Sequence, residues 1–69
     1  MNMDSRVIAV DATDRFVNVA FDMAVCSLNE MAQRKALDVV SISHEHLRHN
    51  LGIDDWVSTV TILAVVRPA

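Results

Sequence analysis

The segment from Trp56 to Val66 most constrains the fold of this chain, because it alternates regularly and carries apolar side chains on both faces. Successive side chains of a strand point to opposite sides of a sheet. One face would hold Trp56, Ser58, Val60, Ile62, Ala64 and Val66, and the other Val57, Thr59, Thr61, Leu63 and Val65. The pattern predicts a β-strand with substantial apolar area on each side.

An earlier strand and a long helix are predicted in the first half of the chain. Arg6 to Val10 is a short β-branched, apolar run that ends at Asp11. Asp11 and Thr13 are candidate helix N-caps, and Arg34 suits the negative end of a helix dipole, so we expect the helix to end near it. The apolar stripe at helical spacing comprises Val17, Phe21, Ala24, Leu28 and Met31.

The middle of the chain allows two interpretations. Leu37 to Ser43 reads as a second strand, since β-branched residues alternate with serines. From His44 to Leu51 the pattern is polar. Ser43 could cap one or two helical turns that end at Gly52, or the segment could be a long β-hairpin connection. The choice decides how the histidines of this segment point.

These elements predict an α+β fold of βαββ order, with one long helix packed on a small three-stranded antiparallel sheet. The 69 residues suffice for a single domain, 1–69, whose core is marginal. Cys26 is the only cysteine, so no intrachain disulfide forms, and we expect a reducing, cytoplasmic location. With 52% hydrophobic residues we expect a homo-oligomer, whose interface lies on the sheet face opposite the helix. Its candidate residues are Val57, Leu63 and Val65.

Charge and hydropathy narrow the classes of partner. The net charge is −3 and the six basic residues are scattered, which disfavours a nucleic-acid partner. No apolar run approaches the roughly 18 residues that a membrane-spanning helix needs, so no membrane partner is expected. The expected partners are other copies of the chain and another protein.

The chain resembles the dodecins, small flavin-storing proteins in which a three-stranded antiparallel sheet wraps one helix. The resemblance rests on the opening run Arg6 to Thr13, the closing run Ser58 to Val65, and the βαββ order. It implies the same plan and an oligomer. Dodecins stack their flavin on a tryptophan of the middle strand, whereas Leu37 to Val40 contains no aromatic residue. Thr59 stands near that family's glutamine and Ala12 at its glycine, so we expect no bound flavin or other cofactor.

Ligand-type residues cluster at one place only. His44, His46 and His49 lie close together, and strand or helix spacing would bring two of them onto one face, as zinc or nickel would require. The alternative is a polar connection with solvated histidines. Cys26, among apolar helix residues, is expected to be a small buried hydrophobe.

Trp56 follows Asp54 and Asp55 at the start of the last strand. We expect its ring to close the core under the helix; alternatively, Trp56 and the two aspartates form a partner-binding site. No catalytic motif is present, so we predict a non-enzymatic interaction or regulatory protein, a homo-oligomer that binds another macromolecule. The alternatives are a small-ligand-binding or storage oligomer of dodecin-like plan, and a histidine-based metal-binding module.

Overall fold

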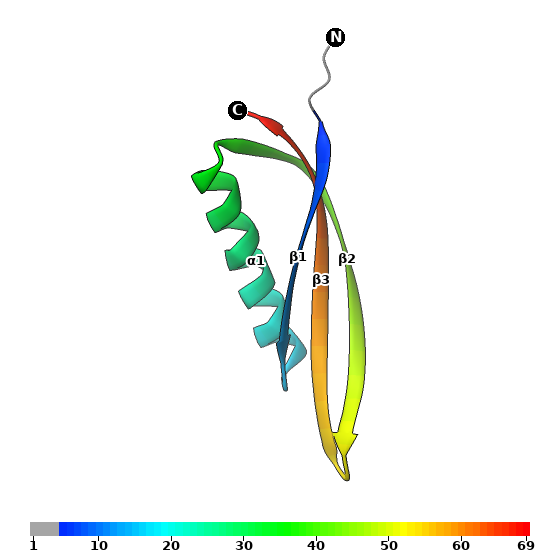
Figure 1. Ribbon diagram of the computed structural model, residues 1–69. Coiled ribbons are helices and arrows are strands. Elements are labelled where there is room, and N and C mark those ends of the chain that lie inside the picture. The colour runs from blue at the N-terminus through cyan, green and yellow to red at the C-terminus, as the bar shows by residue number, and fades with distance from the viewer. Residues whose placement is uncertain (1–4) are drawn as a thin grey trace.

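The computed structural model describes residues 5–69, in which one helix packs on a three-stranded antiparallel sheet (Figure 1). The elements are β1 (Arg6–Asp14), α1 (Val17–Arg34), β2 (Leu37–Gly52) and β3 (Asp55–Pro68). The sheet order is β1-β3-β2, so the last strand of the chain lies in the centre. This confirms the predicted α+β class and βαββ order. The single domain was predicted over residues 1–69, and residues 1–4 of it lie outside the described residues.

The register of the sheet confirms the alternation predicted for the last strand. Val10 of β1 and His44 of β2 both lie opposite Ile62, on the side that faces α1. The β3 residues on this side are buried: Ser58, Val60, Ile62, Ala64 and Val66. The other side of β3 has no helix on it (Figure 1).

Small residues carry the contact between helix and sheet. The buried positions of α1 are Ala20, Ala24, Leu28 and Ala32, which recur every four residues along one face. The predicted stripe was rotated relative to this face. Ala24 and Leu28 are in the core, and Phe21 is partly buried, but Val17 is 42% exposed. Three alanines let the helix axis approach the sheet closely, so larger apolar side chains are displaced to its flanks.

The predicted helix N-caps are wrong, because β1 runs four residues further than expected. Asp11 and Thr13 lie within β1, opposite Thr61 and Thr59 of β3. The Thr13 and Thr59 hydroxyls share a hydrogen bond of 2.8 Å. Phe16 occupies the N-cap position without a side-chain cap, and its N–H donates to Asp14 Oδ2 at 3.0 Å. Pairing with β3 therefore takes the residues that the local pattern assigned to capping.

Strand β2 continues to Gly52, so residues 44–51 are extended and the helical alternative is wrong. Each of these residues except Leu51 pairs with β3, up to Asn50 opposite Trp56. Ile53 and Asp54 form the turn, and Asp54 has a φ of 57° in the left-handed region, which aspartate tolerates better than most residues. Asn50 Oδ1 accepts a hydrogen bond of 2.9 Å from the Gly52 N–H. The result is a long β2–β3 hairpin.

The molecule is elongated, with extents of 53 × 19 × 13 Å. The β2–β3 hairpin projects beyond the N-terminal end of α1 (Figure 1). At the other end the helix stops at Arg34, as predicted, and Ala36 turns the chain with a φ of 53°. Within residues 5–69 no helix has both the length and the apolar character needed to cross a membrane.

Candidate functional site

The sheet side turned away from α1, here called the open sheet face, is the first candidate surface. Its rows follow from the register of the three strands, so that Ala9, Leu63 and Ser43 form one row and Val7, Val65 and Ser41 the next. Val7 is 64% exposed and Leu63 is 41% exposed. The face thus leaves large apolar side chains in solvent on two neighbouring strands.

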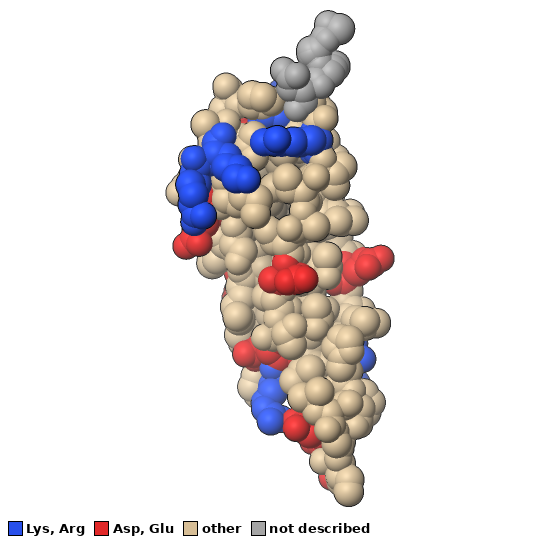
Figure 2. All heavy atoms as spheres, in the orientation of Figure 1, with Lys and Arg blue, Asp and Glu red and all other residues tan. Residues whose placement is uncertain are grey.

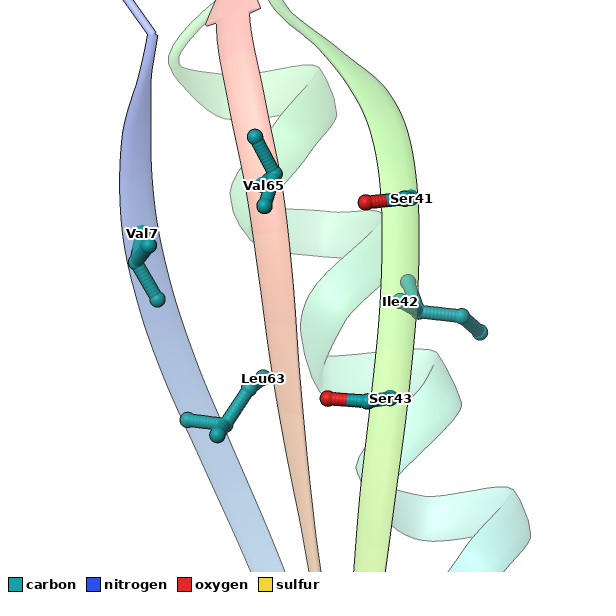
Figure 3. A pocket seen from close by; sticks show the side chains of 6 residues that line it. All are labelled: Val7, Ser41, Ile42, Ser43, Leu63 and Val65. Carbon is teal, nitrogen blue, oxygen red and sulfur yellow. The ribbon is translucent and has the colours of Figure 1, made fainter.

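A shallow depression of about 220 Å³ lies on this face. Figure 3 shows Leu63 and Val65 of β3 between Val7 of β1 and two serines of β2. The lining residues are Val7, Ser41, Ile42, Ser43, Leu63 and Val65. Sites for small molecules usually enclose about 300–1,000 Å³. An open depression of this size is better suited to receiving a side chain from another protein than to enclosing a ligand.

A second candidate surface, here called the hairpin surface, comprises His44, His46, Arg48 and Trp56 on the helix side of β2 and β3. The rings of His44 and Phe21 meet edge to face, with centroids 5.3 Å apart. His46 Nε2 and Ser58 Oγ share a hydrogen bond of 3.1 Å. The guanidinium carbon of Arg48 lies 4.7 Å from the centre of the Trp56 ring, within range of a cation–π interaction. These contacts hold the side chains in place along an otherwise exposed strip.

The expectation that Trp56 closes the core is wrong, because its side chain is 42% exposed. The strand face was predicted correctly, since Trp56 shares its side with buried Ser58 and Val60. However, the last pair between β1 and β3 is Asp14 with Ser58, so Trp56 lies past the end of β1. The guanidinium of Arg48, from the neighbouring strand, lies over the ring.

The two aspartates before Trp56 have different positions. Asp54 occupies the hairpin turn and is exposed. Asp55 is half-buried and pairs with Arg15, whose Nη1 lies 2.7 Å from Asp55 Oδ1. This ion pair ties the hairpin to the connection between β1 and α1. Asp55 is therefore committed to an internal contact, and Asp54 is the freer of the two for a partner.

The three histidines do not come together. Strand geometry places His44 and His46 on the hairpin surface and His49 on the opposite side, across from Val57. Among residues 5–69 no group of three or more His, Cys, Asp or Glu side chains is arranged to hold a metal ion. A metal bound here would have two protein ligands from one chain at most, and a second copy would have to supply the others.

Cys26 is exposed, so the expectation of a buried thiol is wrong. The physical reason is the rotation of the helix: the buried face runs through Ala24 and Leu28, and Cys26 lies two residues from each. Positions two apart on a helix do not share a face.

Several residues of these surfaces were not identified in the sequence analysis. Val7, Ser41, Ile42 and Ser43 line the depression, and the alternation of serine with β-branched residues along β2 was the available signal for the two serines. The stacking of Arg48 on Trp56 depends on cross-strand register and had no local signal.

Comparison of the chain with protein-family models, curated proteins and solved structures found no match. The resemblance to dodecins therefore stays a prediction.

Proposed function

We propose that this chain is a small non-enzymatic interaction protein that associates with itself through the open sheet face and binds another macromolecule through the hairpin surface. The observation that carries the proposal is the uncovered apolar area on the open sheet face, centred on Val7, Leu63 and Val65. Exposed contiguous apolar patches on small domains mark interaction sites.

Self-association is favoured by how little of the sheet the helix covers. Only Leu37 of β2 belongs to the core among the described residues, and the rest of that strand is exposed. A domain of this size has a marginal core, and burial of the open sheet face against a second copy would add to its stability.

The hairpin surface has the composition of a binding site for a protein. Tryptophan and arginine are the residues most enriched among those that dominate binding energy, and here Trp56 and Arg48 are stacked and accessible. Ile53, at the adjacent turn, is 96% exposed. The ion pair between Arg15 and Asp55 ties the turn end of the hairpin to the connection between β1 and α1, so these side chains are presented on a braced element. A partner protein would bury them.

Light scattering together with an absorption spectrum tests the proposal. We expect a mass above 7.7 kDa that rises with concentration, and no absorption beyond that of Trp56 in the near ultraviolet. Leu63→Lys should return the mass to that of a monomer, because it places a charge in the apolar patch.

Asn29→Lys is the matched control, since Asn29 is exposed on α1 and the substitution adds the same charge. A monomeric mass for the parent protein at every concentration up to 0.5 mM would contradict self-association. Visible colour in the preparation would favour a cofactor-storage function instead.

A further inference from the structure

Strand β2 forms a free edge of the sheet. The order β1-β3-β2 pairs one side of β2 with β3, and among residues 5–69 no strand pairs with the N–H and C=O groups of its other side. From residue 41 to residue 50 the pairing with β3 is continuous, and both register shifts lie outside this range. All these residues are exposed, and they include no proline or lysine, which commonly protect edge strands from further pairing. Residues 41–50, here called the free edge, are thus open to a further strand.

Side chains that can carry a positive charge line one side of the free edge. By register and alternation the helix side of this segment holds Ile42, His44, His46, Arg48 and Asn50. Three basic residues therefore follow one another on that side, and no carboxylate lies among them. The carboxylate of the free edge is that of Glu45, which is on the open sheet face opposite Thr61.

The carboxylates of the hairpin region have other positions or partners. Asp14 belongs to β1, which β3 separates from β2, and Asp54 lies in the turn beyond the free edge. Asp55 pairs with Arg15. Within residues 5–69 Arg48 makes no ion pair, and its guanidinium lies over the neighbouring indole ring. Figure 2 shows blue side chains beside the hairpin as well as around the C-terminal end of α1, so the hairpin is not uniformly acidic although the net charge is −3.

From this arrangement we infer that the free edge binds an extended acidic segment of a partner protein, which joins the sheet as a fourth strand beside β2. The inference rests on the proposed function and names the chemistry of the partner. Hydrogen bonds between the two backbones supply affinity, and side chains at every second position supply specificity. Carboxylates of the segment face His44, His46 and Arg48, and an uncharged or basic side chain faces Glu45 on the other side.

A second copy of the chain is disfavoured at this edge by the same charges. When two β2 edges pair antiparallel about a two-fold axis, side chains of the same side face each other. Every such arrangement centred between His44 and Arg48 places two of the basic side chains of the helix side opposite each other, and like charges directly opposite oppose pairing. The other edge of the sheet, β1, carries Asp11 and Asp14, so it disfavours an acidic segment.

Hydrogen exchange with a probe peptide tests the inference. The probe alternates threonine with glutamate over about ten residues, and both of its ends are blocked so that they carry no charge. Added to the full chain, it should slow exchange at every second backbone amide of the free edge by at least about tenfold at saturation, because only those N–H groups point away from β3. The fluorescence of Trp56 should also change, since Arg48 lies over its ring.

Two matched peptides separate strand addition from charge. With proline in place of each threonine the peptide keeps all its carboxylates and loses backbone donors, so it should bind at least about tenfold more weakly. With lysine in place of each glutamate the peptide keeps the strand pattern and reverses the charge, so it should not protect the free edge.

Variants of the chain provide the second arm. Arg48→Glu should weaken binding of the glutamate peptide at least about tenfold and allow the lysine peptide to bind. Arg48→Gln keeps a side chain of similar length and should weaken binding several-fold, so the test holds even if the charge reversal disturbs the hairpin. Arg34→Glu, exposed in the last turn of α1, makes the same change of charge away from the free edge and should leave binding unchanged.

Equal binding of the proline peptide, or binding that protects no amide of the free edge, overturns strand addition, while a response of Trp56 leaves the hairpin surface as a binding site. Equal binding of the glutamate and lysine peptides, or no binding of the glutamate peptide up to about 1 mM, also overturns the inference. Amides of the free edge that are protected without peptide, and lose protection on dilution, would show a second copy there instead. The proposed self-association through the open sheet face is read separately, from the mass of the protein without peptide.

Discussion

Truncation of Ile62 tests the core directly. Ile62 is 0% exposed in the central strand, with Val10 and His44 as its sheet neighbours. Replacing it by alanine removes three carbons and leaves a cavity under the helix, which costs about 2–5 kcal/mol. A single core in a chain this short supplies only about 3–5 kcal/mol. We therefore expect Ile62→Ala to lose most of the free energy of unfolding, and Ile62→Val to lose about 0.5–1.5 kcal/mol.

Ile53 provides a matched control, because the same side chain is 96% exposed at the hairpin turn. Ile53→Ala should change the free energy of unfolding by less than about 0.5 kcal/mol. Urea denaturation followed by far-ultraviolet circular dichroism measures both, and repeating it at several protein concentrations separates self-association from folding. The reasoning is refuted if Ile62→Ala stays within 0.5 kcal/mol of the parent, or if Ile53→Ala costs as much as Ile62→Ala.

Three further predictions follow from individual positions. Ala36→Gly should raise the free energy of unfolding by up to about 1 kcal/mol and Ala36→Val should lower it, because Ala36 has a φ of 53°; thermal denaturation showing the reverse order would contradict this. Ala24→Leu should lower the free energy of unfolding by about 1–3 kcal/mol, measured by urea denaturation, because it overpacks a site that is 0% exposed. Cys26→Leu, on the exposed side of the helix, should be nearly neutral. Equal losses would argue against the observed rotation of the helix. Trp56→Ala should lower the free energy of unfolding by about 1 kcal/mol, well below the 3–5 kcal/mol of a fully buried tryptophan. The fluorescence of Trp56 should be readily quenched by acrylamide, and its emission should shift in Arg48→Ala. Emission typical of a buried indole would contradict the half-exposed position.

The overall fold was predictable because its two most periodic segments are unambiguous. The last strand alternates without interruption and has apolar residues on both sides, so its period of two and its two faces could be assigned correctly. The helix end near Arg34 also follows from local signals. These features depend on residues that are neighbours in the sequence, and local patterns record them well.

The two other strands were underestimated because their length depends on partners far along the chain. Thr13 is a good N-cap in isolation, but a hydrogen bond to Thr59 and pairing with β3 keep it in β1. His44 to Asn50 have no strong strand pattern and extend because β3 offers them hydrogen-bonding partners. The energy of a strand pair lies in cross-strand contacts, which a single sequence does not display.

For the candidate surfaces too, features that follow from local alternation were predicted and features that depend on distant elements were missed. Leu63 and Val65 were assigned to the open side of the sheet from alternation, and the structure places them there. The exposure of Trp56 was missed, since alternation specifies the side on which a residue lies and not how far the helix reaches along that side.

The difference in length between helix and hairpin accounts for the exposed surfaces. Helix α1 has 18 residues and so spans about 27 Å, whereas β2 has 16 residues and spans about 53 Å. One helix can therefore cover only about half the length of the sheet, and the remainder must project into solvent. A chain that only had to be stable would place polar side chains on that remainder. Here Leu51, Ile53 and Trp56 occupy it and are exposed, which is the arrangement expected of a strand pair that another molecule covers.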